Sequence, residues 1–355
     1  MKKWIFIILC CGIIISGCLE EITLKNQKLE TKAIIIQGKL IKGTPSIAEV
    51  WVRRIGDFEG YEAETHLSGA KVFLVSDDGT SIQVTEELEN KRYRAVIPEN
   101  GPSFRVETGR SYHIEVSLLD GAQFVSEPEP MLPVAKIDQV NYKMIDLTIQ
   151  KDDGSVNTED YIQFMVSTPL QLNDMQERAR LRWQLFAAYR LTDDNFNTCY
   201  NLEPLRTDQT FIYNGEAFQS ERLDTFPLVN IQFDFRFAEG FYLTLVQESL
   251  SENAFTYWNQ IKILAERNGN MFDPPAGKIL TNIKNIKTPD AEVYGYFYVA
   301  PQDTLRRYIR PEEVGSPKKY CPLPPPTAPR MSPTLCDNCL IGSGSSLKKP
   351  TYWIE

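Results

Sequence analysis

Histidine is scarce in this chain of 355 residues, which contains only His66 and His113. Imidazole is the commonest general base and a frequent metal ligand, so sites built on it have little raw material here. The flanking letters, ETHLSG and RSYHIEV, are typical of a loop and a strand, so we expect both side chains at the surface. No phosphate-binding loop and no GxSxG nucleophile elbow occurs either. We therefore predict no catalytic residue, no metal site, no cofactor and no enzyme.

The chain also has no excess of basic residues over acidic ones. The 38 Lys and Arg residues are outnumbered by 47 Asp and Glu residues, which gives a net charge of -9. An acidic balance without a basic patch argues against binding to a phosphate backbone, so no nucleic-acid partner is expected. The composition is otherwise ordinary for a folded globular chain, with 42% hydrophobic and 24% charged residues.

Long apolar runs are absent except near the start, and that run is short. Trp4 to Ile15 covers 12 residues. A helix of that length spans roughly 18 Å, well short of the ~30 Å hydrocarbon core of a membrane. Behind the basic residues Lys2 and Lys3, such a run is typical of a secretory signal rather than of a membrane anchor.

The residues after this run indicate lipid attachment. Ile15-Ser16-Gly17-Cys18 resembles the bacterial lipobox, in which cleavage precedes a cysteine that carries the lipid. We predict that residues 1–17 are a lipoprotein signal peptide and that Cys18 is lipidated, palmitate being one expected acyl chain. Three acyl chains would hold the protein firmly on a membrane, since two already suffice. The alternative is a cleaved signal with an incidental cysteine.

An acidic pair, Glu20-Glu21, follows Cys18. It resembles the surface-export signal of Bacteroidota-type lipoproteins, although a simple solvated tether over residues 18–30 would look the same. The resemblance implies a location in the outer membrane, lipid-anchored and exposed at the cell surface.

Cysteine is sparse as well. Of seven cysteines, Cys10 and Cys11 would leave with the signal and Cys18 would be lipidated. The remaining four are an even number outside the cytoplasm, where disulfides persist. We predict structural disulfides in one of three possible connectivities. A zinc site or a redox CxxC motif is the alternative for these four residues: Cys199, Cys321, Cys336 and Cys339.

Alternating apolar residues predict a β-sandwich domain over residues 31–130. Val72 and Leu74 share one strand face, and Tyr112, Ile114 and Val116 share another. The Asp-Gly pairs that follow these strands are typical of hairpin turns. The pattern G-A-x-V-x-L…D-D-G…T-G-x-x-Y-x-I-x-V resembles the transthyretin-like or carboxypeptidase-regulatory sandwich. A segment with three prolines, residues 126–138, then predicts an extended linker or domain edge.

A larger β-rich domain with one or two helices is predicted over residues 131–315. The segment NIQFDFRF alternates as a strand and is expected to pair with GFYLTLVQES after the Glu239-Gly240 turn. We also predict a strand in ARLRWQLFAAYRLTD, with a helix as the alternative, and another in EVYGYFYVAP. A mostly β fold follows for the whole mature chain.

One helix has a clearer signal. Ser249-Leu250-Ser251-Glu252 fits a capping box, and apolar residues then recur at helical spacing until Gly269. We expect the aromatic residues on this helix to lie in the core rather than to bind a ligand.

The tail, residues 316–355, is rich in proline, which rules out a helix or a central strand. Its three cysteines and the closing Tyr352-Trp353-Ile354 predict that it is packed on the second domain instead of free. Just before the tail, Asp303-Thr304-Leu305 resembles an acceptor for O-linked glycans, a tripeptide that also arises by chance.

Taken together, these features resemble the outer-membrane lipoprotein family known as domain of unknown function 4249. The residues that carry the resemblance are Ser251 to Trp258, Gly295-Tyr296-Phe297, the CxxC motif and Lys349 to Trp353. The resemblance implies an accessory role beside a TonB-dependent transporter in nutrient uptake, and it carries over no catalytic residue. A structural or adhesive surface lipoprotein without a transporter is the alternative, and an envelope hydrolase is a third.

Overall fold

The computed structural model describes residues 33–55, 64–151, 153–172, 177–206, 208–217, 220–267, 279–321 and 334–354. The predicted signal peptide, the lipidation site Cys18, the tether and Gly269 lie outside these ranges, so those predictions stay predictions. Within the described ranges, no helix is both long and apolar enough to cross a membrane.

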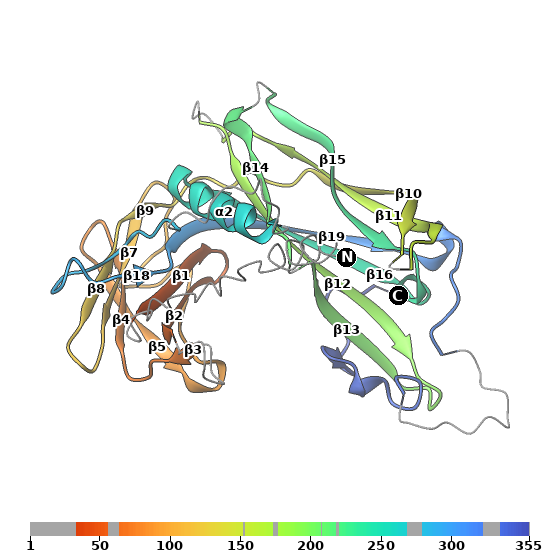
Figure 1. Cartoon of the computed structure of the whole chain (residues 1–355), viewed down its shortest axis with the longest axis horizontal. Helices are drawn as coiled ribbons and strands as arrows, with labels where there is room; N and C mark the ends of the chain where they lie inside the picture. Colours follow the sequence, from red (N-terminus) through yellow and green to blue (C-terminus); the bar gives the residue numbers. More distant parts are fainter. Residues whose placement is uncertain are drawn as a thin grey trace, which may run out of the picture.

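The fold is mostly β, as predicted, and Figure 1 shows two lobes joined across the middle of the molecule. The first lobe is built mainly from strands early in the chain. These are β1 (Ile34–Lys42), β2 (Ser46–Ile55), β3 (Glu64–His66), β4 (Lys71–Ser76), β5 (Ser81–Glu87), β6 (Arg92–Ile97), β7 (Ser111–Ser117), β8 (Gln123–Ser126) and β9 (Glu129–Pro130), with a 3-10 turn η1 (Leu88–Asn90).

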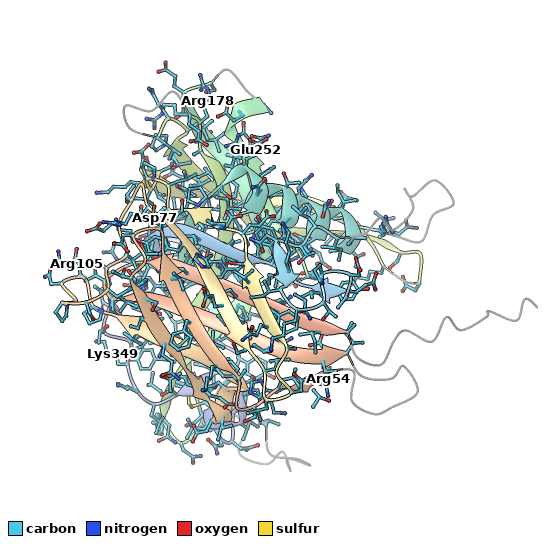
Figure 2. All side chains as sticks on the ribbon, turned by 90° about the vertical axis from the view of Figure 1, so that its left-hand side faces the viewer. Arg54, Asp77, Arg105, Arg178, Glu252 and Lys349 are labelled. Carbon is cyan, nitrogen blue, oxygen red and sulfur yellow. A yellow bond between two sulfur atoms is a disulfide. The ribbon has the colours of Figure 1, made fainter. Side chains whose placement is uncertain are left out.

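The expected hairpins are present in this lobe. β4 pairs with β5 around Gly79, and β7 pairs with β8 around Gly121; both glycines have a positive φ, of 83° and 89°. The side chains predicted to share a face, such as Val72 and Ile114, are buried in one core. Figure 2 faces this lobe, and Arg54 and Asp77 lie at opposite ends of it. The resemblance to a transthyretin-like sandwich stays a prediction.

Segments from late in the chain complete this first core. β17 (Ile283–Asn285) pairs with β8, and β18 (Val293–Tyr294) pairs with β1. The first half of β19 (Phe297–Ile309) also runs parallel to β1. Ile283, Val293 and Phe297 are therefore buried with the side chains of the first lobe. The predicted domain boundaries stay a prediction, but the first hydrophobic core includes more of the chain than residues 31–130.

The second lobe packs two sheets face to face. One sheet contains β10 (Gln139–Gln150), β11 (Val156–Pro169) and β15 (Arg222–Gln232). The other contains β12 (Arg180–Thr192), β13 (Thr198–Leu205), β14 (Phe211–Asn214), β16 (Phe241–Leu250), the second half of β19 and the short β20 (Ser345–Ser346). The 3-10 turns are η2 (Gly215–Ala217), η3 (Phe235–Phe237), η4 (Pro311–Val314) and η5 (Cys339–Ile341).

The core between these sheets explains why β12 is a strand. Its alternate residues Leu181, Trp183 and Leu185 are buried against Phe164 and Phe241, while the residues between them face the other way. The strand prediction for this segment is thus confirmed over its helical alternative.

The predicted hairpin between NIQFDFRF and GFYLTLVQES is wrong. β15 ends at Gln232 and pairs with β11, whereas β16 pairs with β12 and β19. The strand stops because the Asp234 carboxylate accepts a hydrogen bond from the backbone N–H of Arg236 at 2.9 Å and caps η3. This turn still buries Phe237, so the aromatic alternation is satisfied without a strand.

Helix α2 (Glu252–Ala265) is present, but its cap lies two residues later than predicted. Ser251 caps it by accepting a hydrogen bond from the Ala254 N–H at 3.1 Å. Ser249 is still inside β16, and its hydroxyl oxygen accepts from the Ala135 N–H instead. The helix lies over the junction of the two lobes (Figure 1). Its Tyr257 packs in a small core there with Tyr296, while the other two aromatic residues of the helix, Phe255 and Trp258, are partly buried against that core.

Buried polar groups hold the junction together. The Glu129 carboxyl, 1% exposed, accepts hydrogen bonds of 2.5 Å from the Ser251 and Tyr296 hydroxyls. The Gln247 side chain donates to the Ala135 carbonyl at 2.7 Å, which fastens the proline-rich segment onto β16. Apart from the end of β8 and the short β9, that segment has no regular secondary structure, and its Met131 and Leu132 are buried in the cores of the first and the second lobe.

A buried ion pair lies under α2. Arg182 contacts the Glu248 carboxylate at 2.7 Å, and the exposed fractions of the two side chains are 15% and 1%. The same guanidinium lies 3.8 Å from the centre of the Trp258 ring. The pair is closed off by the helix, so we assign it a structural role.

Candidate interaction site

All four cysteines predicted to form disulfides are paired, at the far end of the second lobe. Cys199 of β13 is bonded to Cys339, and Cys321 is bonded to Cys336. The structure therefore selects one of the three connectivities that the sequence allowed. The two cysteines of the CxxC motif, Cys336 and Cys339, bond to different partners. The tail is stapled to the second lobe, as predicted, and lies beside β13 in Figure 1.

The loop between β12 and β13 is built to receive the tail. The Asp193 carboxylate, 3% exposed, accepts hydrogen bonds from the N–H groups of Asn195, Asn197 and Cys339. Burial raises the pKa of Asp193, but the bonds from Asn197, Cys339 and Asn195 outweigh it and hold that pKa below its ordinary value. A carboxylate that stays ionised thus fixes both the hairpin loop and the start of η5.

Three apolar side chains are exposed on this stapled loop. Phe196 is 81% exposed, Leu340 is 45% exposed and Ile341 is 52% exposed. Phe196 also has φ +63°, a left-handed conformation that is uncommon for a bulky residue. Two hydrogen bonds, from the Asp194 N–H to the Cys336 carbonyl and from the Asn195 amide to the Asp337 carbonyl, join the two segments. We call Phe196, Leu340 and Ile341 the apolar tip.

The end of the tail packs on an aromatic cluster beside the tip. Trp353, 4% exposed, contacts Tyr242 and Tyr200 with ring centres 5.0 and 5.2 Å apart. The Tyr242 hydroxyl donates to the Tyr352 carbonyl at 3.0 Å and accepts from the Ile354 N–H at 3.2 Å. Of the closing residues Tyr352-Trp353-Ile354, the first two therefore pack on the lobe as expected, whereas the Ile354 side chain is 52% exposed. The cluster explains how a proline-rich segment keeps one position on the lobe.

Cations border this cluster. The Arg306 guanidinium lies 4.3 Å from the Tyr352 ring centre, and the Arg190 guanidinium lies 5.7 Å from that of Trp353. Beside them is a pocket of about 420 Å³. Arg190, Ala238, Glu239, Tyr308, Arg310, Pro311, Glu312 and Lys319 line it. Burial raises the pKa of Tyr308 although Arg190 opposes the shift, so its hydroxyl is a neutral hydrogen-bond donor at neutral pH.

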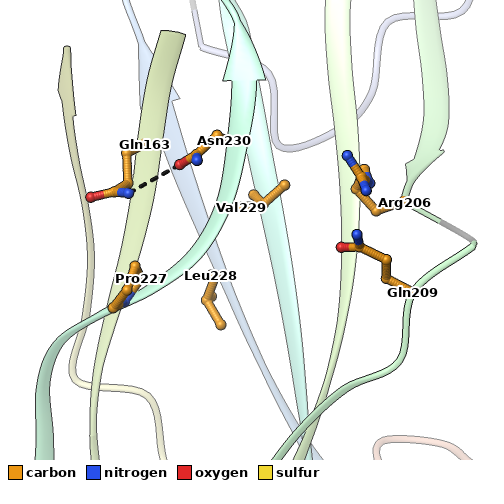
Figure 3. A pocket seen from close by; sticks show the side chains of 7 residues that line it. All are labelled: Gln163, Arg206, Gln209, Pro227, Leu228, Val229 and Asn230. Atoms are coloured by element: carbon orange, nitrogen blue, oxygen red, sulfur yellow. Dashed lines mark hydrogen bonds between the residues drawn. The ribbon is translucent and has the colours of Figure 1, made fainter. Parts of the chain in front are cut away.

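A second hollow lies on the side of the same lobe and is shown in Figure 3. Its volume is about 240 Å³, and amide side chains dominate its polar lining. Gln163 donates to Asn230 at 3.1 Å across β11 and β15, while Arg206 and Gln209 lie on the opposite side. Two of its amide side chains already bond to each other, so it offers a ligand fewer unpaired hydrogen-bonding groups than the pocket beside Arg190 does.

The other residues singled out in the sequence lie apart from this site. His66 contacts the Glu86 carboxylate at 2.9 Å and is only 10% exposed, so it is more covered than expected. Thr304 lies in the middle of β19 opposite Val246, and its glycosylation stays a prediction. Among the described residues, no group of three or more His, Cys, Asp or Glu side chains is placed to hold a metal ion.

Sequence reasoning found the cysteines and the closing aromatic residues, but it missed Phe196, Arg190 and Asp193. The letters DDNFN contain a turn signal, since Asp and Asn tolerate left-handed backbone. They do not reveal that an aromatic residue takes that conformation. In the sequence, nothing distinguishes Arg190 from other charged residues on the exposed faces of strands.

The fold and the stapled tail first define a class: a two-lobed β protein whose C-terminal tail is cross-linked to the second lobe. The chain belongs to the family described as Domain of unknown function (DUF4249), whose sequence pattern matches residues 20–306. No curated protein matches the chain. Ser251 to Trp258 and Gly295 to Phe297 lie inside the matched region, whereas the CxxC motif and Lys349 to Trp353 lie beyond it.

Proposed function

We propose that this protein is a lipid-anchored outer-membrane accessory protein that binds a TonB-dependent transporter and assists nutrient uptake. The lipobox at Cys18 supports the anchor, and the two disulfides suit a compartment where disulfides persist. The resemblance of the chain to outer-membrane lipoproteins supports the transporter partner. The alternative is a structural or adhesive surface lipoprotein that works without a transporter.

The apolar tip is the observation that carries this proposal. Exposed apolar groups on a folded surface usually mark an interaction site. Strained backbone persists where the surrounding structure holds it, often at functional positions. Phe196 combines both features, with 81% exposure and φ +63°. The Asp193 hydrogen bonds and the Cys199–Cys339 disulfide hold it in place, so it can dock without first being ordered.

The anchor and the tip would act together. Lipid at Cys18 confines the protein to the plane that holds the transporter, and confinement raises the effective concentration of the partner without new contacts. A tip of three apolar side chains can then give a specific complex from a small contact area. No catalytic step is needed in this mechanism.

The test is co-purification of the tagged full-length protein from outer membranes in mild detergent, followed by mass spectrometry. The expected result is a stoichiometric TonB-dependent barrel with the wild type and its loss with Cys18→Ala. A triple variant, Phe196→Ser, Leu340→Ser and Ile341→Ser, is expected to stay on the membrane but to lose the barrel.

A control replaces apolar residues that are also exposed but lie on the first lobe. Leu88 and Leu119 are 67% and 83% exposed, so Leu88→Ser with Leu119→Ser changes surface polarity without touching the tip. This control is expected to keep the barrel. If the wild type is membrane-bound but recovered alone, the transporter proposal fails and the structural or adhesive alternative takes its place.

A further inference from the structure

The pocket beside the aromatic cluster gathers cations from separate parts of the chain. Arg190 comes from β12, Arg310 follows β19, and Lys319 lies in the segment that leads to Cys321. Their convergence on a volume of about 420 Å³ is unusual in a chain of net charge -9. The Tyr308 hydroxyl, on the same wall, adds a neutral hydrogen-bond donor.

Arg190 is the most important cation of this pocket for binding, because its guanidinium has no carboxylate partner among the described residues. It is half-buried, and its Nε donates to the Glu239 carbonyl at 2.7 Å. No carboxylate of the described residues lies within ion-pair distance of its guanidinium. A cation that is removed from water without an anionic partner is costly, so a bound anion would recover free energy there.

The two carboxylates on the lining do not supply that anion. The Glu239 carboxylate already accepts hydrogen bonds from the Thr192 N–H at 3.2 Å and from the Thr192 hydroxyl at 2.6 Å. It also lies 3.7 Å from the Lys319 ammonium. Glu312 is exposed at the rim. Arg310 lies 3.5 Å from the Glu313 carboxylate and Lys319 is paired with Glu239, so among the described residues Arg190 is the cation of this pocket without a carboxylate partner.

Guanidinium and ammonium groups with a hydroxyl donor are the usual partners of carboxylate and phosphate oxygens. We propose that this pocket binds the carboxylate or phosphate group of a small organic anion. This inference rests on the proposed function as a binding protein. It adds the chemical class of the ligand that this pocket would bind. The two terminal nitrogens of the Arg190 guanidinium, whose Nε is engaged by Glu239, would supply bidentate contacts, and Lys319 and Arg310 lie at the exposed rim.

The proposal is tested by calorimetric titration of the full mature protein in detergent at low salt. Citrate and inorganic phosphate are the two probes, because they separate carboxylate from phosphate as the favoured oxyanion. Saturable binding of at least one probe is expected. Arg190→Gln is expected to weaken it at least tenfold, and raising the salt concentration should weaken it further.

A matched control removes one positive charge elsewhere. Arg222 on β15 is exposed and pairs with Asp138 and Asp224, so Arg222→Gln changes the net charge equally but leaves the pocket intact. It is expected to bind as the wild type does. Because Arg190 also contacts Trp353, the double variant Lys319→Gln and Arg310→Gln serves as a second pocket variant with only exposed changes.

Absence of saturable binding to both probes would overturn the proposal, as would equal affinity in the wild type and both pocket variants. Co-purification of the barrel with Arg190→Gln separates this outcome from the proposed function. A pocket variant that still brings down the barrel but binds no anion supports both statements. An anion-binding wild type that brings down no barrel supports the pocket and rejects the transporter.

Discussion

A single buried carboxyl, that of Glu129, connects both lobes, because it accepts hydrogen bonds from Ser251 at the start of α2 and from Tyr296 just before β19. No positively charged side chain of the described residues pairs with it. Burial raises the pKa of Glu129 above its ordinary value of 4.5, and the hydrogen bonds from Ser251 and Tyr296 only partly oppose that rise. The protonated acid is therefore the form that the fold favours.

This shift predicts a pH dependence of stability with a definite sign. Because the folded state holds the proton more tightly than the unfolded chain does, this stabilisation is complete below pH 4.5 and is lost as pH rises through the folded pKa. The loss is up to about 1.4 kcal/mol per pH unit within that window. Glu129→Gln removes the dependence and keeps a group of the same shape. Urea unfolding from pH 4 to pH 9 measures the difference, and parallel curves for the two proteins would refute this account.

The Arg182–Glu248 pair gives a second prediction at the scale of residues. Replacing one buried partner leaves the other charge uncompensated, so Arg182→Met is expected to lower the free energy of unfolding by about 3–5 kcal/mol. The double variant Arg182→Met and Glu248→Leu should lose less than the single one, because no charge is then left buried. Urea denaturation of both variants checks this, and a double variant less stable than Arg182→Met would contradict it.

Sequence reasoning at this scale succeeded where one residue type decides the outcome and failed where neighbours decide it. The four cysteines could be recognised as disulfide partners from their number, but their pairing depends on which segments meet in space. Ser249 and Ser251 offer the same hydroxyl two residues apart. Only the end of β16, set by its pairing with β12, decides which of them caps the helix.

At the scale of elements, period-two alternation predicted most strands, and it failed at β15 for a physical reason. Phe235 and Phe237 alternate with polar residues as a strand would, yet a 3-10 turn also buries Phe237. Alternation records which residues are buried, not which hydrogen bonds the backbone makes. The dual pairing of β19, with β1 in its first half and β16 in its second, leaves no local signal either.

The two disulfides act on the same tail element but close loops of very different length. The Cys199–Cys339 bond joins residues 140 apart, and the Cys321–Cys336 bond joins residues 15 apart. Loop-closure entropy then predicts a stabilisation of about 5 kcal/mol for the first and about 3 kcal/mol for the second. Cys199→Ser with Cys339→Ser should therefore lower the unfolding midpoint more than Cys321→Ser with Cys336→Ser. Equal midpoints in denaturant titrations would show that entropy of the unfolded chain is not the main effect.

At the scale of the whole molecule, the start of the fold and the apolar tip lie at opposite ends. β1 begins beside Val293, whereas the far end of β19 reaches Ile309 next to the start of β16. The 13 residues of β19 alone correspond to about 43 Å. Figure 1 shows the same separation, with β1 in one lobe and β13 at the end of the other.

This separation predicts that the anchor and the fold can be uncoupled. Cys18 precedes the first described strand by 16 residues, since β1 begins at Ile34, so Cys18→Ala should leave the thermal unfolding midpoint of the mature chain unchanged. If the proposed lipid anchor is correct, the same variant should move the protein from the membrane fraction to the soluble fraction once residues 1–17 are removed, because one or more acyl chains would supply the attachment. Intact-mass spectrometry of the wild type should show the added diacylglycerol and acyl groups. Membrane retention of a Cys18→Ala protein whose intact mass shows that residues 1–17 have been removed would mean that the folded surface itself binds the membrane, and the apolar tip would then be the first place to look for that contact.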